Sequence, residues 1–208
     1  MQFSSSFRET LSQRVTQLES HSSVELVVVI LDQSGSYADI DHLWGFGAAM
    51  AGLTVMIHTP LEFPPDLVVL LTVAIYTVGL AVSHKFHAIR RLLATRARRQ
   101  TQVLDQARIC FVSEGVADTR ERSGILLLIS GLERRAVILP DIGVEARVPR
   151  SVFNQLEHEW SESSSLQDFE TRVLQGLAGL AEPLAKALPR RPDDSNELSD
   201  EIRLKVAR

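Results

Sequence analysis

Two long runs without a formally charged residue dominate the first half of the chain. Leu43–Thr59 and Leu67–Ser83 are each 17 residues long. As α-helices they would extend about 26 Å, close to the ~30 Å hydrocarbon core of a bilayer. The link between them, residues 60–66, contains three prolines and both acids of the segment 43–84. Because proline cannot continue a helix, we expect a hairpin of two membrane-spanning helices.

The first of these runs is rich in small side chains, which would let the second helix pack closely against it. These residues are Gly45, Gly47, Ala48, Ala49, Ala51 and Gly52. The alternative is a pair of buried core helices in a soluble protein, since both runs are at the lower length limit for spanning.

Basic side chains cluster directly after the second run. They are Lys85, Arg90, Arg91, Arg96, Arg98 and Arg99, whereas the link 60–66 has no Lys or Arg. Positive charge near a membrane helix is retained on the cytoplasmic side. Residues 1–23 also lack the apolar core of a signal peptide. The pattern predicts a multi-pass membrane protein with both termini cytoplasmic.

Composition and charge exclude several classes of protein. The chain has 22 Lys and Arg against 26 Asp and Glu, a net charge of −4, which excludes a generally basic nucleic-acid binder. One cysteine excludes an internal disulfide and a multi-cysteine zinc site. The basic cluster could bind nucleic acid, but Phe86 is its one aromatic residue and anionic lipid headgroups explain its charge. We expect the lipid bilayer and other membrane or cytoplasmic proteins as partners, and no nucleic acid.

Outside the two runs, the chain alternates helix-like and strand-like patterns, which predicts an α/β unit. Phe7, Leu11, Val15 and Leu18 have the spacing of an amphipathic helix. Val24–Leu31 is rich in β-branched residues, as a strand covered on both faces requires.

Two later apolar runs predict an antiparallel strand pair. Gly124–Ser130 and Arg135–Leu139 are separated by only four residues, whereas a parallel crossover needs about a dozen. Helices are expected from Phe86 to about Gly115, over Ser151–Trp160, and over Leu166–Leu188, the last kinked or shortened at Pro183. We therefore divide the chain into 1–42 (first helix and strand), 43–84 (membrane hairpin), 85–188 (remainder of the α/β domain) and 189–208 (charged, flexible tail).

Short motifs on both sides of the two runs share one pattern. Ser23–Val29 (SVELVVV) is followed by Ser34–Tyr37 (SGSY) and the two apolar runs, and Thr119–Leu127 (TRERSGILL) leads into the first strand of the later pair. These segments resemble the membrane-inserted branch of the TPM-domain family. Further similar segments are Leu132–Arg135, Pro140–Val144, Trp160 and Asn196–Leu198. The likeness extends from about Phe7 to Leu198.

The resemblance implies a three-layer α/β/α fold with a small mixed sheet, interrupted by the transmembrane hairpin. Relatives have been described as phosphatase-like or as binders of divalent cations, but a shared fold alone transfers neither function. Many relatives carry Asn-Asp-Asn before the Gly that opens the middle strand. Here Glu121, Arg122 and Ser123 precede Gly124, so a cation replaces the usual acid. This departure weakens the metal hypothesis.

One end of the predicted strand pair gathers charged residues. Residues just before the first strand should lie beside those just after the second. Asp118, Arg120, Glu121 and Arg122 would therefore approach Asp141 and Glu145. The simplest interpretation is a network of ion pairs at the sheet end.

Two binding hypotheses compete with that interpretation. Asp118, Glu121, Asp141 and Glu145 could hold Ca²⁺ or Mg²⁺, which would need several converging oxygens. Alternatively, Arg120 and Arg122 could bind a phosphate or carboxylate. We expect a binding or interaction module, which could bind a divalent cation such as Ca²⁺ or Mg²⁺. The alternative is a metal-assisted, phosphatase-like hydrolase, for which the sequence names no catalytic residue.

Other chemistry-bearing residues give weaker hypotheses. His84 and His87 could share a metal but are ordinary at a membrane interface. Cys110, on an apolar helix face, is expected in the core. Asp32 ends the first strand, where α/β ligand sites occur, but could equally cap a turn. We expect Trp44 at the membrane interface and Trp160 covering the core.

Overall fold

The computed structural model describes residues 3–190, residue 198 and residues 202–205. The chain forms two compact units: Met1–Gly35 with Arg99–Arg208, and the intervening Ser36–Arg98. The first is an α/β unit and the second is helical. The helical unit extends beyond the expected hairpin segment, 43–84, at both ends, and the α/β unit is assembled from chain on both sides of it.

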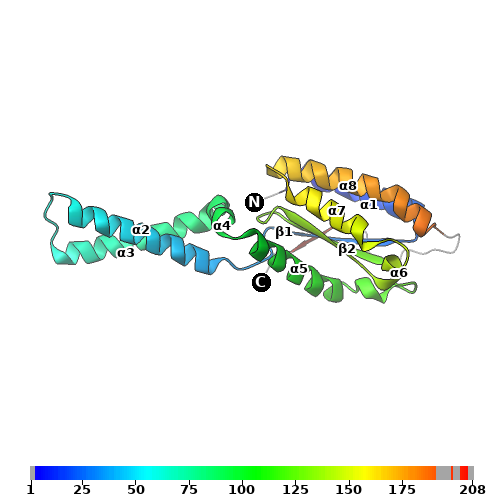
Figure 1. The fold of residues 1–208 in the computed structure, drawn as a ribbon, viewed down its shortest axis with the longest axis horizontal. Helices are drawn as coiled ribbons and strands as arrows, with labels where there is room; N and C mark the ends of the chain where they lie inside the picture. Colours follow the sequence, from blue (N-terminus) through cyan, green and yellow to red (C-terminus); the bar gives the residue numbers. More distant parts are fainter. Residues whose placement is uncertain (1–2, 191–197, 199–201, 206–208) are drawn as a thin grey trace. The chain divides into compact units, whose positions relative to one another are not determined.

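A four-stranded mixed sheet forms the centre of the α/β unit (Figure 1). Its strands are β1 Glu25–Leu31, β2 Gly124–Ser130, β3 Arg135–Pro140 and β4 Arg203–Lys205, in the spatial order β3-β2-β1-β4. β1 is parallel to both β2 and β4, whereas β2 and β3 are antiparallel. The antiparallel pair is confirmed, with β2 at the expected bounds.

Helices cover both faces of this sheet (Figure 1). On one face, Leu26 and Val28 of β1 pack in one core with side chains of α1, α7 and α8. On the other face, Val27 and Val29 pack with side chains of α5. These helices are α1 Ser5–His21, α5 Arg96–Ser113, α7 Arg150–Ser161 and α8 Leu166–Ala187. The continuous apolar run of β1 is therefore explained by burial on both faces.

Two details of the α/β unit differ from the expectations. Part of the expected tail, Arg203–Lys205, forms β4 beside β1, while most of 189–208, including Asn196 and Glu197, lies outside the described residues. α8 continues through Pro183, which is exposed. Because Pro183 has no N–H, the carbonyl of Gly179 lacks its helical hydrogen bond. Gly179 is exposed, so water can bond to this carbonyl instead.

The helical unit contains α2 Ala38–His58, α3 Pro65–Lys85 and the short α4 His87–Leu93. α2 and α3 are each long and apolar enough to cross a membrane. They approach closely at small residues, as predicted: a Cβ on Gly79 would lie 2.9 Å from Gly45 Cα. Gly47, in contrast, has nothing within 4 Å of a Cβ position.

The single helix expected from Phe86 to Gly115 is instead two helices. α4 ends at Leu93, and Ala94 has an extended backbone. Thr95 Oγ1 then accepts a hydrogen bond from Arg98 N at 3.2 Å, which caps the first turn of α5. The chain therefore breaks where a capping residue begins the second helix.

Candidate functional site

The loop before β2 and the end of β3 meet at the amino end of β2. Asp141 N donates to Gly124 O at 2.8 Å, and Gly143 N donates to Arg122 O at 3.1 Å. A Cβ on Gly143 would lie 2.3 Å from Glu121 O, so only glycine permits this approach. The antiparallel strand pair thus brings the predicted charged residues into one region.

Arg122 and Asp141 form the central ion pair of this region. Arg122 Nε and Nη2 donate to the two carboxylate oxygens of Asp141 at 2.6 and 3.0 Å. The Asp141 side chain is 3% exposed, whereas that of Arg122 is 46% exposed. Hydrogen bonding to Asp141 raises the pKa of the Arg122 guanidinium. Asp141 also accepts from Ile142 N at 2.8 Å and so caps the short helix α6, Ile142–Glu145.

The other predicted residues are more exposed than Asp141, and Asp118 is close enough to Arg122 for its charge to help raise the pKa of the guanidinium. Asp118, at the end of the 3-10 helix Val116–Asp118, is exposed, as are Arg120 and Glu121. Glu145 lies 4.0 Å from Arg150 Nη1. Across residues 3–190, 198 and 202–205, no group of three or more His, Cys, Asp or Glu side chains is arranged to hold a metal ion.

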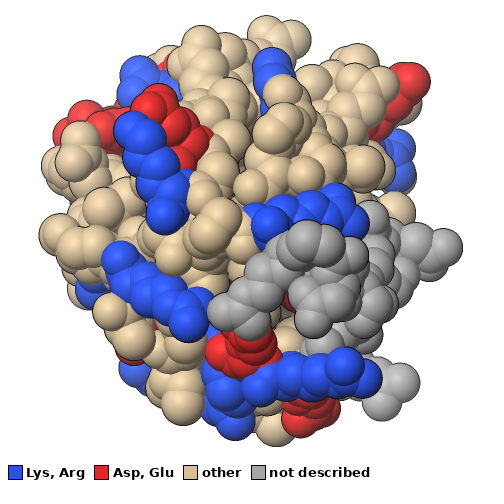
Figure 2. All heavy atoms as spheres, turned by 90° about the vertical axis from the view of Figure 1, so that its right-hand side faces the viewer, with Lys and Arg blue, Asp and Glu red and all other residues tan. Residues whose placement is uncertain are grey.

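The approach of Arg122 to Asp141 agrees with the ion-pair interpretation. The face of the molecule in Figure 2 likewise has basic and acidic side chains interspersed among neutral ones, not a field of one sign. The cation site and the anion site at Arg120 and Arg122 both stay predictions.

A buried carboxylate that the sequence analysis missed lies at the opposite end of the sheet. Glu133, in the turn between β2 and β3, is 1% exposed. Ser34 N donates to its Oε1 and Oε2 at 3.1 and 3.2 Å, and Ser130 Oγ donates to Oε2. Glu133 therefore joins the exit loop of β1 to the end of β2. The signal was an acid in a short turn between two apolar runs.

Arg134 follows Glu133 in an unusual environment. Its φ of 47° is in the left-handed region. Arg134 Nη1 donates to Ser164 O at 2.7 Å. The pKa of the Arg134 guanidinium is lowered mainly by burial and, to a smaller extent, by repulsion from Arg99. Asp32, the other candidate at this end, is exposed, and its backbone carbonyl accepts from Leu132 N at 2.9 Å.

A buried ion pair, also missed, lies inside the helical unit. Arg90 of α4 donates from Nε to Asp41 Oδ1 at 2.9 Å and from Nη2 to Asp41 Oδ2 at 2.5 Å. Ser83 Oγ donates to Asp41 Oδ1 at 2.7 Å, and His84 Nδ1 is 2.7 Å from Arg90 Nη2. Asp41, Ser83 and Arg90 are all buried. His84 thus contacts an arginine, which does not favour a metal there.

A neighbouring pair uses another residue of the basic cluster. Arg98 donates from Nη1 and Nη2 to the Asp39 carboxylate at 2.6 and 2.7 Å, and its guanidinium lies 5.3 Å from the Tyr37 ring centroid. The hydrogen bonds to Asp39 raise the pKa of Arg98. Two of the six basic residues after the second apolar run are therefore neutralised by acids of α2.

Of the remaining candidates, Cys110 and Trp160 lie in the core and Trp44 lies on the surface of α2. Cys110 is 1% exposed and belongs to the core between α5 and the sheet. Trp160 is 1% exposed, and its Nε1 donates to Arg172 O at 3.0 Å, which confirms its place in the core. Trp44 is 40% exposed on α2.

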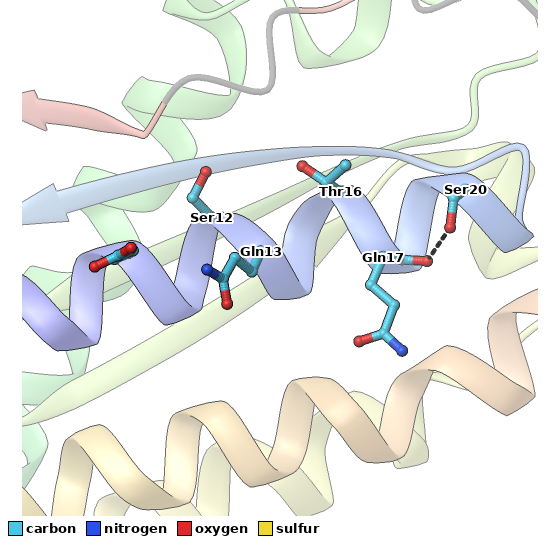
Figure 3. A pocket seen from close by; sticks show the side chains of 6 residues that line it. Ser12, Gln13, Thr16, Gln17 and Ser20 are labelled. Atoms are coloured by element: carbon cyan, nitrogen blue, oxygen red, sulfur yellow. Dashed lines mark hydrogen bonds between the residues drawn. The ribbon is translucent and has the colours of Figure 1, made fainter.

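A shallow hollow of about 620 Å³ runs along the outer face of α1 (Figure 3). Its described lining residues are Glu9, Ser12, Gln13, Thr16, Gln17 and Ser20. Ser20 Oγ is already used, since it donates to Gln17 O at 2.7 Å. The described lining comes from one helix and brings no catalytic group together.

Comparison with known proteins gives a fold and no function. No protein-family model matches the chain, and no curated protein matches it. The NMR structure of the BA42 protein from the psychrophilic bacterium Bizionia argentinensis is similar, with a TM-score of 0.56 and 13% sequence identity. The match covers 99% of this chain and 97% of that chain. At this identity the likeness shows the fold alone.

Proposed function

We propose that this chain is an integral membrane protein of the TPM-domain family, with α2 and α3 spanning the bacterial inner membrane and the α/β unit acting as a cytoplasmic binding or interaction module. The observation that carries the proposal is the outward-facing apolar surface of α2 and α3. In their most apolar 18-residue windows, only 28% and 11% of the residues are buried.

Large apolar side chains on these helices are more than half exposed. They are Leu43, Phe46, Val55, Ile57, Val69, Leu70, Val73 and Val78. A helix in the core of a soluble protein would bury such side chains, because each gives about 1.5–3 kcal/mol on leaving water. Lipid accounts for their exposure.

The pairing of β1 with β2 supports a hairpin with both flanks on one side of the membrane. β1 precedes α2 and β2 follows α3, yet Glu25–Leu31 pairs in parallel with Gly124–Ser130 along its whole length. Strands on opposite sides of a bilayer could not pair, so the chain must cross it an even number of times. Exposed Lys85 and Arg96 favour the cytoplasmic side.

The α/β unit supports a binding role better than hydrolysis. Both oxygens of Asp141 are engaged by Arg122, and in the described part of the chain three acids nowhere converge. Metal-assisted hydrolysis needs acids that hold a cation and activate water. The proposal therefore includes no reaction.

Membrane insertion and orientation are tested by extraction and labelling. The protein should stay in the membrane fraction during alkaline carbonate extraction. Single cysteines at Ser5, Ser164 and Glu62, in a Cys110→Ser background, should react with an impermeant maleimide from outside intact cells only at position 62. Permeabilised cells give the control for reactivity. Labelling at positions 5 and 164 from outside would contradict the orientation.

The absence of hydrolysis is tested at the amino end of β2. Phosphomonoester hydrolysis that depends on Asp118, Glu121 and Asp141 should be absent, and calorimetry with Ca²⁺ and Mg²⁺ measures cation binding in the same samples. Asp118→Asn and Glu121→Asn are the informative variants, because neither side chain is buried. Hydrolysis that is lost in these variants would favour the hydrolase alternative, whereas cation binding that is lost without any hydrolysis would favour a module that binds a divalent cation.

A further inference from the structure

The short helix α4 is tied to the start of α2 by the Asp41–Arg90 pair. Both hydrogen bonds run between the planar guanidinium and the two carboxylate oxygens, which fixes orientation as well as distance. Arg90 is 5% exposed and Asp41 is 7% exposed. Because Arg90 lies on α4, the pair fixes which side of α4 faces the other two helices.

This rotation turns apolar side chains outward. Leu92 lies two residues after Arg90, about 200° around the helix, and is 84% exposed. Phe86, at the junction between α3 and α4, is 54% exposed, and Leu93 is 40% exposed. Exposure of these apolar side chains to water is unfavourable. Because α4 directly follows the apolar helix α3, the surface of the membrane would lie next to α4.

Two exposed cations flank the same segment. Lys85 ends α3 and Arg96 begins α5. Arg90 and Arg98, in contrast, are paired with Asp41 and Asp39. A short helix with apolar side chains outward and cations beside it matches an interfacial helix in an anionic membrane.

We propose that α4 lies in the plane of the membrane surface, with Phe86 and Leu92 at the acyl boundary and with Lys85 and Arg96 bound to anionic phospholipid headgroups. This inference rests on the proposed insertion of α2 and α3 and names the lipid that the protein binds. The Asp41–Arg90 pair is the positioning element, since it holds α4 in the required rotation.

The experiment measures the depth of α4 in vesicles. Full-length protein with Leu92→Cys in a Cys110→Ser background carries a bimane label and is reconstituted in phosphatidylcholine, alone or mixed with phosphatidylglycerol. Gln100→Cys, at an exposed position, is the aqueous reference. In anionic vesicles, the uncharged quencher acrylamide should quench the label at position 92 several-fold less than at position 100, because a label at the acyl boundary is shielded from water and an uncharged quencher is not depleted at an anionic surface.

Charge variants test the headgroup contact. Lys85→Gln with Arg96→Gln should raise quenching at position 92 to its value in phosphatidylcholine alone. Arg14→Gln with Arg147→Gln is the matched control, because it removes two exposed cations of the α/β unit and should change nothing. Asp41→Asn should also raise quenching at position 92, because α4 is then no longer held in its orientation about the helix axis. If Asp41→Asn fails to fold, the double variant still tests the proposal without touching the buried pair.

Two results would overturn the inference. If the protein resists carbonate extraction but quenching is equal at positions 92 and 100, the hairpin is inserted and α4 does not lie in the interface. If the label at position 92 is equally protected from quenching with and without phosphatidylglycerol, anionic headgroups do not bind this segment. Loss of the protein from the carbonate-resistant fraction would instead contradict the proposed function on which the inference rests.

Discussion

Gly176 of α8 lies directly against the indole of Trp160 in α7. A Cβ on Gly176 would lie 2.7 Å from Trp160 Nε1 and 2.8 Å from Cζ2. The same Nε1 donates to Arg172 O at 3.0 Å, so the indole cannot move away without losing that bond. Gly176→Ala should therefore lower the free energy of unfolding by about 1–3 kcal/mol.

Gly179→Ala is the matched control, because it lies in the same helix and nothing is within 4 Å of its Cβ position. Alanine favours a helix over glycine by about 1 kcal/mol, so this variant should be unchanged or more stable. Thermal unfolding of the purified protein in detergent compares the two. Similar melting temperatures for both variants would contradict the close contact at Trp160.

The Arg122–Asp141 pair gives an asymmetric prediction. Asp141→Ala removes a buried acceptor of two arginine hydrogen bonds and the cap of α6, so it should cost about 1–3 kcal/mol. Arg122→Gln should cost less, because its half-exposed side chain leaves room for water at the Asp141 carboxylate. Urea unfolding measures both. A larger loss in Arg122→Gln would show that water does not reach the Asp141 carboxylate once its counter-charge is removed.

The sequence predicts the main elements of the fold because their signals are local. The β-branched run of β1 requires two covered faces, and the short turn before Arg135 requires an antiparallel pair. Position in the chain also predicts the approach of Arg122 to Asp141. The break at Thr95 is less visible, since capping by one hydroxyl is a weak signal inside a helical pattern. β4 has no local signal: three residues form a strand there only because the edge of β1 is open to pairing.

The buried polar contacts escape prediction for a different reason. Asp41 and Arg90 are 49 residues apart, and Ser34 and Glu133 are 99 apart. Each pair depends on how whole helices and strands dock, which no local spacing encodes.

Glu157 gives the pH dependence that the structure predicts. Burial raises the pKa of its carboxyl, while a hydrogen bond from Ile138 N and the charge of Arg150 oppose the rise. The folded protein therefore binds this proton more tightly than the unfolded chain, whose carboxyl titrates near 4.5. The associated stability is fully present below that pH and is lost as the pH rises through the folded-state pKa.

Glu157→Gln removes this titration. The difference in unfolding free energy between Glu157→Gln and the wild type should therefore shift in favour of the variant between pH 4 and pH 8, in a series of urea titrations. Asn154→Gln, at an exposed position in the same helix, removes no ionisable group and should show no such drift. A difference for Glu157→Gln that stays constant across the series would mean that its pKa is not raised.

Glu133 and Ser34 should respond in opposite ways to the loss of a polar group. Glu133→Gln places an amide where Ser34 N and Ser130 Oγ both donate, so one buried donor loses its acceptor and the cost should be about 1–3 kcal/mol. Ser34 Oγ is buried and has no hydrogen-bond partner among the described residues. Ser34→Ala should therefore be neutral or stabilising, since the backbone N–H that binds Glu133 is kept. Chemical unfolding of both variants decides this, and a loss in Ser34→Ala as large as in Glu133→Gln would show that the hydroxyl holds the loop after β1.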